Sequence, residues 1–255
     1  MDIYPSGKDS RSCFSFRKLM PTVTSVMWHP NPELRERWLR EYGKDRFSFE
    51  EAREAQSFPE SWSFPPQKAK RWKWLAEAFP PKVALYLFSK YVKGKDLILL
   101  DLFAGIGGWS LGAVWSGKFN KIIMVEKDPE KVSHLWENFR RLGAGFRIIC
   151  GDARTIDCDF HVDVVASSPP CEDLCMLRFF SYNSINKGTV SLTLFTMDLV
   201  EKLRPKVAFY ENVYRIQLKE ALEKRGWETY RFDMSEIIPQ KRIRLIAIKK
   251  FKGTP

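Results

Sequence analysis

From residue 97 onward, short apolar runs alternate with segments whose apolar residues recur at helical spacing. The runs cover residues 97–103, 121–126, 146–150, 162–167, 206–211, 227–234 and 243–250. Continuous apolar runs of this length are typical of strands that are buried on both faces and connected by helices. The pattern predicts an α/β fold with a mostly parallel, doubly wound sheet.

The helix between the second and third runs has clear start and stop signals. Asp128 can cap its first turn, Pro129 suits its first position, and Gly143 can end it. Its expected buried face consists of Val132, Leu135, Trp136, Phe139 and Leu142. The same kinds of signal predict helices between residues 81 and 94 and over residues 191–205.

The first 65 residues are punctuated by prolines and show little periodicity. Only the charged stretch from Pro32 to Tyr42 is predicted to be helical. We therefore expect an irregular N-terminal appendage over residues 1–65 and the main domain over residues 66–255.

The chain carries 42 Lys and Arg residues against 31 Asp and Glu residues, a formal charge of +11. This surplus favours a polyanionic partner such as nucleic acid, although a merely basic surface gives the same count. The sequence has neither a membrane-length apolar stretch nor a signal-peptide pattern, so we expect a cytoplasmic protein with no membrane partner. The five cysteines lack disulfide or zinc spacing and the three histidines are scattered, so no metal site is expected.

Glycines and carboxylates gather where the first three strands end. The turn DLFAGIGG brings Gly105, Gly107 and Gly108 together, so the backbone can curl tightly and approach a ligand. Glu126 ends the second strand, where it can accept hydrogen bonds from both ribose hydroxyls, and Asp152 follows the third strand. Each feature alone could be a plain turn or helix cap, but their occurrence at successive strand ends predicts an adenosine site.

Reactive groups follow the later strands. Cys171 comes after two prolines in SSPPC, and Glu211 ends the fifth strand in ENV. In IPQKRIRL, the residues Gln240, Arg242 and Arg244 alternate, which predicts that they share one face of a strand. A thiolate, a carboxyl group and guanidinium groups at one sheet edge indicate covalent addition of sulfur to an electron-poor ring, with the carboxylic acid protonating a ring nitrogen.

Together these motifs resemble those of the cytosine-5 DNA methyltransferases. DLFAGIGG resembles their first motif, PPC the nucleophile motif, ENV the acid motif and PQKRIR the Q-x-R-x-R motif. The resemblance implies a Rossmann-like S-adenosylmethionine-dependent methyltransferase fold, S-adenosylmethionine as methyl donor, S-adenosylhomocysteine as product and DNA as substrate. It further implies that Cys171 adds to C6 of a flipped cytosine while Glu211 engages N3. Arg242 and Arg244 are then expected to hold the base and the reactive loop.

The resemblance also implies a set of donor-binding residues. Phe103 is expected near the adenine, Glu126 on the ribose and Asp152 at the adenine. The full expected set is Asp101, Phe103, Ala104, Gly105, Gly107, Gly108, Glu126, Asp152, Ala153 and Pro170.

The order of the motifs departs from the usual order of the family. Residues 47–64 resemble the ninth motif and residues 74–87 the tenth, yet both precede the first, so the chain resembles a circular permutation. Glu77 stands where the tenth motif has Asn, and Glu172 stands where the nucleophile motif continues with Gln. The family's long DNA-reading segment has no counterpart of similar length. We therefore expect minimal recognition by the N-terminal segment or a separate recognition subunit, in a nucleoid-associated restriction-modification or DNA-marking system of a prokaryote.

Other interpretations stay open at the level of sequence. SSPPC resembles the motif of amino-methylating DNA enzymes, with Cys171 in place of their aromatic residue. RNA could replace DNA as the substrate, and the chain could be a non-catalytic DNA-binding subunit with the same fold. Trp62, Trp72 and Trp74, which are interleaved with basic residues, could line a DNA face or pack the N-terminal segment on the sheet.

Overall fold

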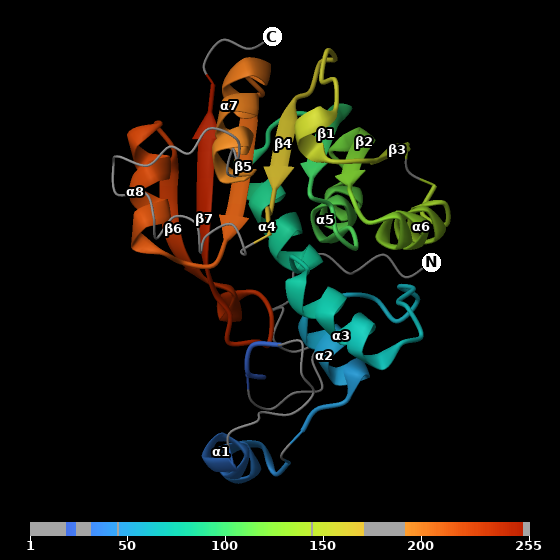
Figure 1. Ribbon diagram of the computed structural model, residues 1–255, viewed down its shortest axis with the longest axis vertical. Helices are drawn as coiled ribbons and strands as arrows, with labels where there is room; N and C mark the ends of the chain where they lie inside the picture. Colours follow the sequence, from blue (N-terminus) through green and yellow to red (C-terminus); the bar gives the residue numbers. More distant parts are fainter. Residues whose placement is uncertain (1–18, 24–31, 45, 144, 171–191, 252–255) are drawn as a thin grey trace.

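A computed structural model of the protein describes residues 19–23, 32–44, 46–143, 145–170 and 192–251. Its centre is a seven-stranded sheet in the order β3-β2-β1-β4-β5-β7-β6 (Figure 1). The five strands β3, β2, β1, β4 and β5 run parallel to one another. The strand β7 is antiparallel to both β5 and β6. The α/β class and the mostly parallel, doubly wound sheet predicted from the apolar runs are confirmed.

The seven strands coincide with the seven predicted apolar runs. They are β1 Leu97–Leu102, β2 Phe119–Glu126, β3 Phe146–Cys150, β4 Val164–Ser167, β5 Val207–Asn212, β6 Glu228–Asp233 and β7 Ile243–Lys250. The bounds of β3 and β7 are as predicted, and the others shift by a residue or two at an end.

Helices cover both faces of the sheet, so the fold has three layers (Figure 1). One face packs against α4 (Pro81–Tyr91), α5 (Gly108–Ser116) and α6 (Pro129–Phe139). The other packs against α7 (Leu192–Leu203) and α8 (Ile216–Lys224). Successive strand residues alternate between the two cores, as Leu99 and Leu100 of β1 do. The central strands β1, β4 and β5 are buried over nearly their whole length, which explains their continuous apolar runs, whereas the outer strands β3 and β6 are partly exposed.

The α6 helix begins as predicted, but its buried face is narrower than predicted. The Asp128 side chain accepts a hydrogen bond from the Glu130 backbone N–H at 2.9 Å, and Pro129 is the first helical residue. Leu135 and Phe139 are fully buried, whereas Trp136 is 56% exposed. The prediction that Trp136 belongs to the buried face is wrong. Because α6 lies over the outer strands β2 and β3, only a narrow stripe of it contacts the sheet.

The N-terminal part is more regular than its prolines suggest. The α1 helix (Pro32–Tyr42) has the predicted bounds, and a second helix, α2 (Phe49–Ala55), was not predicted. The cause of α2 is a capping box, in which the Ser48 side chain accepts from the Glu51 N–H and the Glu51 carboxylate accepts from the Ser48 N–H.

Buried aromatic residues attach this N-terminal part to the sheet. Trp62, Trp72 and Trp74 are at most 5% exposed, and the last two belong to α3 (Lys68–Glu77). The Trp62 indole N–H donates to the Ile106 carbonyl at 3.1 Å. Their burial supports the packing interpretation over a DNA face built from their rings, although Trp62 and Trp74 pack on α6 and the glycine turn instead of on the strands. Residues on both sides of position 65 share one hydrophobic core, so the division into 1–65 and 66–255 stays a prediction.

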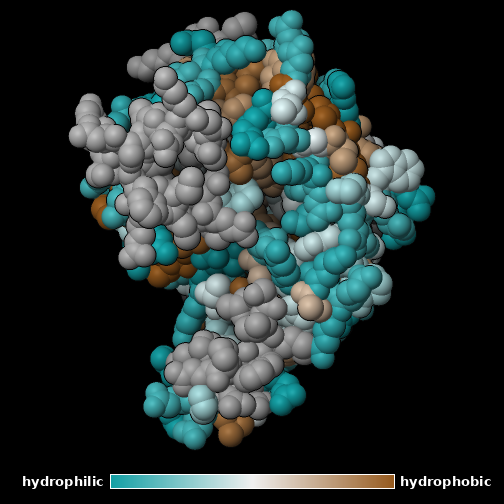
Figure 2. All heavy atoms as spheres, viewed as in Figure 1, coloured by the Kyte–Doolittle hydropathy of each residue, from teal (hydrophilic) through white to brown (hydrophobic). Residues whose placement is uncertain are grey.

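The described part of the face in Figure 2 is largely polar. Figure 2 shows hydrophilic side chains over much of the face in view. Within the described ranges, no helix has the length and apolar character that crossing a membrane requires.

Candidate active site

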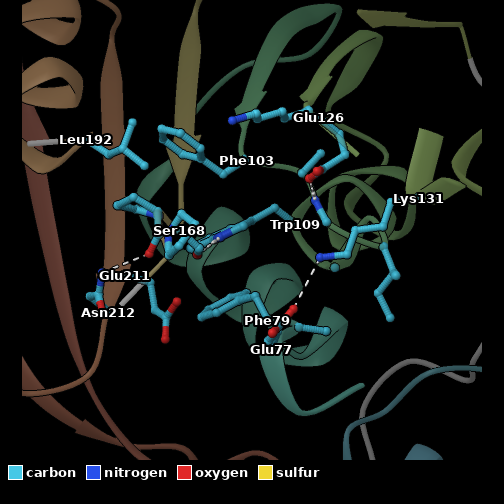
Figure 3. Close-up of a pocket in the computed structure, with 18 of the residues that line it drawn as sticks. Glu77, Phe79, Phe103, Trp109, Glu126, Lys131, Ser168, Leu192, Glu211 and Asn212 are labelled. Atoms are coloured by element: carbon cyan, nitrogen blue, oxygen red, sulfur yellow. Dashed lines mark hydrogen bonds and ion pairs between the residues drawn. The ribbon is translucent and has the colours of Figure 1, made fainter. Parts of the chain in front are cut away.

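A cleft of about 660 Å³ lies at the carboxyl ends of the parallel strands. From β1 the chain builds β2 and β3 on one side of the sheet, and later β4 and β5 on the other. Such a switch of direction leaves a crevice between the two halves, where ligands of open α/β folds bind. Figure 3 shows Glu126 and Lys131 at one end of the cleft, Glu211 and Asn212 at the other, and Trp109 between them.

The predicted glycine turn forms one wall of the cleft. Gly105 and Gly107 have φ values of 57° and 86°, a left-handed conformation that glycine adopts without strain. Gly108 is the first residue of α5, and a Cβ on it would lie 1.9 Å from the Phe79 carbonyl oxygen. The turn therefore depends on glycine both for its backbone conformation and for its close approach to the segment before α4.

Glu126 joins the end of β2 to this turn. One of its carboxylate oxygens accepts from the Gly105 N–H at 2.8 Å, and the other accepts from the Asp128 N–H at 2.9 Å. Each carboxylate oxygen has a second lone pair, so both can still accept a hydroxyl donor from a ligand in the cleft. This arrangement fits the predicted contact with a ribose.

Asp101 lies beneath the glycine turn and does not reach the cleft surface. The residue is completely buried, and one carboxylate oxygen accepts from the Ser110 N–H at 3.2 Å and from the Ser110 hydroxyl at 2.6 Å. Burial raises the pKa of Asp101 to about 7; the Ser110 hydrogen bonds oppose this shift, and the nearby Glu126 adds a little to it. Asp101 therefore supports the turn from below, through the first turn of α5.

Asp152 follows β3 into the cleft and is paired with Arg154. Its carboxylate accepts from the Arg154 backbone N–H at 3.0 Å and from the guanidinium at 3.0 and 2.6 Å. These bonds lower the pKa of Asp152 to about 2. Asp152 and the buried Ala153 line the cleft as predicted, whereas Arg154, the next residue of GDAR, was not singled out from the sequence.

Phe103 and Glu77 complete this end of the cleft. Phe103 is half-buried with φ of 59°, an uncommon conformation for a residue with a side chain. Strained backbone of this kind gathers at functional sites. Glu77, which stands at the position of the tenth-motif Asn, forms an ion pair with Lys131 at 3.2 Å across the cleft wall (Figure 3).

The other end of the cleft holds the predicted acid and one predicted arginine. Glu211, at the end of β5, is 7% exposed, and its carboxylate lies 3.3 Å from the Arg244 Nε. The loop after β4 brings Pro169 and Pro170 to the same cleft. Cys171 lies outside the described residues.

Arg242 lines the cleft but is held differently from the prediction. Gln240 and Arg242 precede β7, which begins at Ile243, so the prediction that they share a strand face with Arg244 is wrong. Gln240 instead pairs with Met20 in an isolated parallel bridge, which draws this loop away from the sheet.

The buried Arg242 guanidinium reaches across to the other wall of the cleft. Its Nη2 donates to the carbonyl oxygens of Ala76 and Ala78 at 3.1 and 3.4 Å. Burial, reinforced by the charge of Arg244, lowers the pKa of Arg242 to about 9, so it stays charged at neutral pH. Its Nε and Nη1 are buried without a partner among the described residues. Two donors of Arg242 are thus left for a ligand or for a segment outside the described residues.

The match to known families falls on the part of the chain that builds this cleft. The family described as C-5 cytosine-specific DNA methylase matches residues 97–248. The chain is 25% identical over 190 residues to the type II methyltransferase M1.HphI of Haemophilus parahaemolyticus, a match that covers 66% of this chain and 50% of that protein. It is 30% identical over 169 residues to the type II methyltransferase M.AplI of Arthrospira platensis, covering 60% and 45%. The chain spans about half the length of these curated relatives.

Solved structures share the fold at low sequence identity. A protein of Pyrococcus horikoshii described as an RNA methyltransferase is 18% identical with a TM-score of 0.51, covering 80% of this chain and 98% of that one. A class I S-adenosylmethionine-dependent methyltransferase of Listeria monocytogenes is 15% identical with a TM-score of 0.50, covering 69% and 60%. The fold is that of the class I methyltransferases, and the family match spans the glycine turn, Glu126, Asp152, Glu211 and both arginines. The chain therefore belongs to the C-5 cytosine-specific DNA methylase family.

Proposed function

We propose that this chain transfers a methyl group from S-adenosylmethionine to C5 of cytosine in DNA, through a covalent bond between Cys171 and a flipped base. The observation that carries the proposal is a single cleft that joins the glycine turn and Glu126 at one end to Glu211, Arg242 and Arg244 at the other. Donor and base would then meet beside Pro169 and Pro170, immediately before Cys171 in the sequence.

The donor end of the cleft suits an adenosine with a charged tail. Glu126 has lone pairs for the ribose hydroxyls, Phe103 offers an aromatic ring for the adenine, and Asp152 lies at the end of the neighbouring strand. Ala104, Gly105 and Gly108 line the cleft with backbone that a ligand can approach, and Ala153 and Pro170 line it as well. Gly107 and Asp101, the other members of the expected set, do not line the cleft. When bound, S-adenosylmethionine supplies an electrophilic methyl group; all other chemistry falls to the residues of the chain.

The base end supplies the groups that make C5 reactive. In the proposal the Cys171 thiolate bonds to C6, the ring electrons shift toward N3, and Glu211 as a carboxylic acid donates a proton there. C5 thereby becomes nucleophilic and takes the methyl group. Loss of the C5 proton to solvent, departure of the sulfur as thiolate and return of the N3 proton to Glu211 restore the aromatic ring and the free enzyme. Arg244, at 3.3 Å from Glu211, orients the carboxyl group, and Arg242 lies beside them in the same wall.

DNA is the proposed substrate because of the family and because of the charge. The formal charge of +11 favours a phosphate polymer, and a base inside a duplex reaches a cleft of this kind only when it is flipped out of the stack.

We infer either a short target or a second, recognition-bearing chain. The support is that the chain spans about half the length of its curated type II relatives, and a specific DNA interface buries on the order of 1,000 Å² or more of protein surface. A role in restriction-modification or DNA marking is proposed on the same relatives.

The test is methyl transfer with the methylated atom identified. The purified chain is incubated with S-adenosylmethionine carrying a labelled methyl group and with duplex DNA or RNA, and the digested nucleosides are analysed by mass spectrometry. We expect 5-methylcytosine from DNA, its loss in Cys171→Ser, and full activity in Cys150→Ser, because Cys150 is exposed and does not line the cleft. N4-methylcytosine or N6-methyladenine would support the amino-methylating alternative. Product formed from RNA alone would support the RNA alternative, and the absence of any product would support a non-catalytic binding subunit.

A further inference from the structure

The turn that leads from β4 to the position of Cys171 is held by side chains from two other elements. The indole Nε1 of Trp109 in α5 donates to the Ser168 hydroxyl at 2.9 Å. The Asn212 side-chain amide at the end of β5 donates to the Pro169 carbonyl oxygen at 3.0 Å. Two adjacent residues of the turn are thus held from opposite sides of the cleft (Figure 3).

The turn has few donors of its own. Pro169 and Pro170 have no backbone N–H, so of the three residues only Ser168 can donate a backbone hydrogen bond. The other polar groups are the carbonyl oxygens, which accept, and the Ser168 hydroxyl, which can also accept. Among the described residues, the Trp109 indole N–H donates to that hydroxyl and the Asn212 amide donates to the Pro169 carbonyl oxygen.

Trp109 is itself firmly placed. It is 2% exposed, and its ring stacks on Phe79 with a centroid distance of 3.9 Å and an interplanar angle of 6°. Phe88 and Phe209 pack against the ring at 5.6 and 5.7 Å. A tryptophan side chain has only one polar donor, and leaving a buried donor without an acceptor is costly, so the Ser168 hydroxyl is the acceptor that satisfies the ring.

We propose that Trp109 is a positioning residue of the methyl transfer, which sets the place of the Ser168–Pro169–Pro170 turn, and hence of the backbone that enters Cys171, relative to the cleft. This inference rests on the proposed function. The hydrogen bond that the Trp109 side chain makes goes to Ser168, so in this proposal Trp109 acts through Ser168. Its stacking on Phe79 makes the segment between α3 and α4 a support for the same turn.

The experiment is a double-mutant cycle with a conservative control. Trp109→Phe keeps an aromatic ring on Phe79 and removes the N–H, Ser168→Ala removes the acceptor, and Ser168→Thr keeps a hydroxyl. We expect Trp109→Phe and Ser168→Ala each to slow methyl transfer in a single turnover by about tenfold. This is the change in rate that corresponds to the free energy of one hydrogen bond from a buried donor. The double variant should be no slower than either single, Ser168→Thr should keep most of the rate, and donor affinity by calorimetry should change less than twofold.

Two results would overturn the inference: losses that multiply in the double variant, or losses of rate matched by equal losses of donor affinity. Hydrogen exchange of the peptide that spans residues 165–175 gives a readout independent of activity. Faster exchange in Trp109→Phe and Ser168→Ala, but not in Ser168→Thr, supports the inference that the Trp109–Ser168 hydrogen bond stabilises the turn. Unchanged exchange in all three variants rejects it. A wild-type chain that forms no 5-methylcytosine counts against the proposed function. In that case the exchange measurement alone tests whether the Trp109–Ser168 hydrogen bond stabilises the turn.

Discussion

Replacing Asp101 with Asn should change how the stability of the protein depends on pH. Asp101 is fully buried beneath the glycine turn, and burial raises its pKa from the ordinary 3.8 to about 7. In the unfolded chain the same carboxyl group loses its proton near pH 4. Between these two pH values the folded protein holds one proton more than the unfolded chain, so its free energy of unfolding falls as the pH rises.

The size of this effect follows from the shift in the pKa. A shift from 3.8 to about 7 corresponds to about 4 kcal/mol of stability lost as the pH rises from about 4 to above 7. Asparagine keeps an oxygen that accepts from the Ser110 N–H and hydroxyl. Its amide NH₂ group takes the place of the second Asp101 oxygen, which is buried and has no hydrogen-bond partner among the described residues. Leaving the N–H groups of this amide unsatisfied costs about 1–3 kcal/mol at every pH. Asp101→Asn should therefore be less stable than wild type near pH 4, where wild type has lost little, and more stable at pH 8.

Urea unfolding at pH 4, 5, 6, 7 and 8 measures this crossing directly. Asp163→Asn is a matched control, because the Lys206 ion pair and the Ile98 N–H lower the pKa of Asp163, against the effect of its burial. The stability that Asp163 provides is present above its unfolded pKa and is lost only as the pH falls through the lowered folded value, so its variant should lose a constant amount across pH 5–8. Parallel stability curves for wild type and Asp101→Asn over this range would refute the assignment of a protonated, buried Asp101.

Three further outcomes are expected. Glu211→Gln should slow the chemical step far more than it weakens DNA binding, because the proton matters as charge develops on the ring; equal losses in single-turnover rate and binding would make Glu211 a structural residue. DNA with 5-fluorocytosine at the target should trap a stable adduct on a denaturing gel, because C5 then has no proton to lose, and an active enzyme that forms none would contradict the covalent route. Gly108→Ala should cost about 1–3 kcal/mol or more in urea unfolding, since the new Cβ meets the Phe79 carbonyl at 1.9 Å. Gly151→Ala, where a Cβ meets nothing within 4 Å, is the control and should be nearly neutral.

Local patterns in the sequence were sufficient for the seven strands and for the helices α1, α4, α6 and α7. The central strands β1, β4 and β5 are buried on both faces, so their apolar runs are visible without knowledge of their neighbours. The start of α6 could be predicted from Asp128 and Pro129, because capping depends only on residues close in the chain. The capping box that starts α2, Ser48 with Glu51, was equally local and could have been found by the same rule.

Contacts between distant residues could not be predicted in this way. The hydrogen bonds from Arg242 to the carbonyl oxygens of Ala76 and Ala78, and from Trp109 to Ser168, join parts of the chain that only the folded sheet brings together. Trp136 was misplaced for a related reason, because helical periodicity gives the direction of an apolar face but not how much sheet is present to cover it. The motifs thus indicated which residues gather at the cleft, whereas the way they are held there depends on tertiary contacts.

Noncovalent packing, rather than chain order, places the segment that resembles the tenth motif. The Phe79 carbonyl lies against Gly108, and Arg242 donates to two carbonyl oxygens of the connection between α3 and α4. These contacts form wherever the segment stands in the chain, provided that its ends can be joined. Here α4 passes into β1 through a short turn, so the join requires no long loop. A helix placed before β1 can therefore build this wall of the cleft without a helix that returns from the far end of the chain.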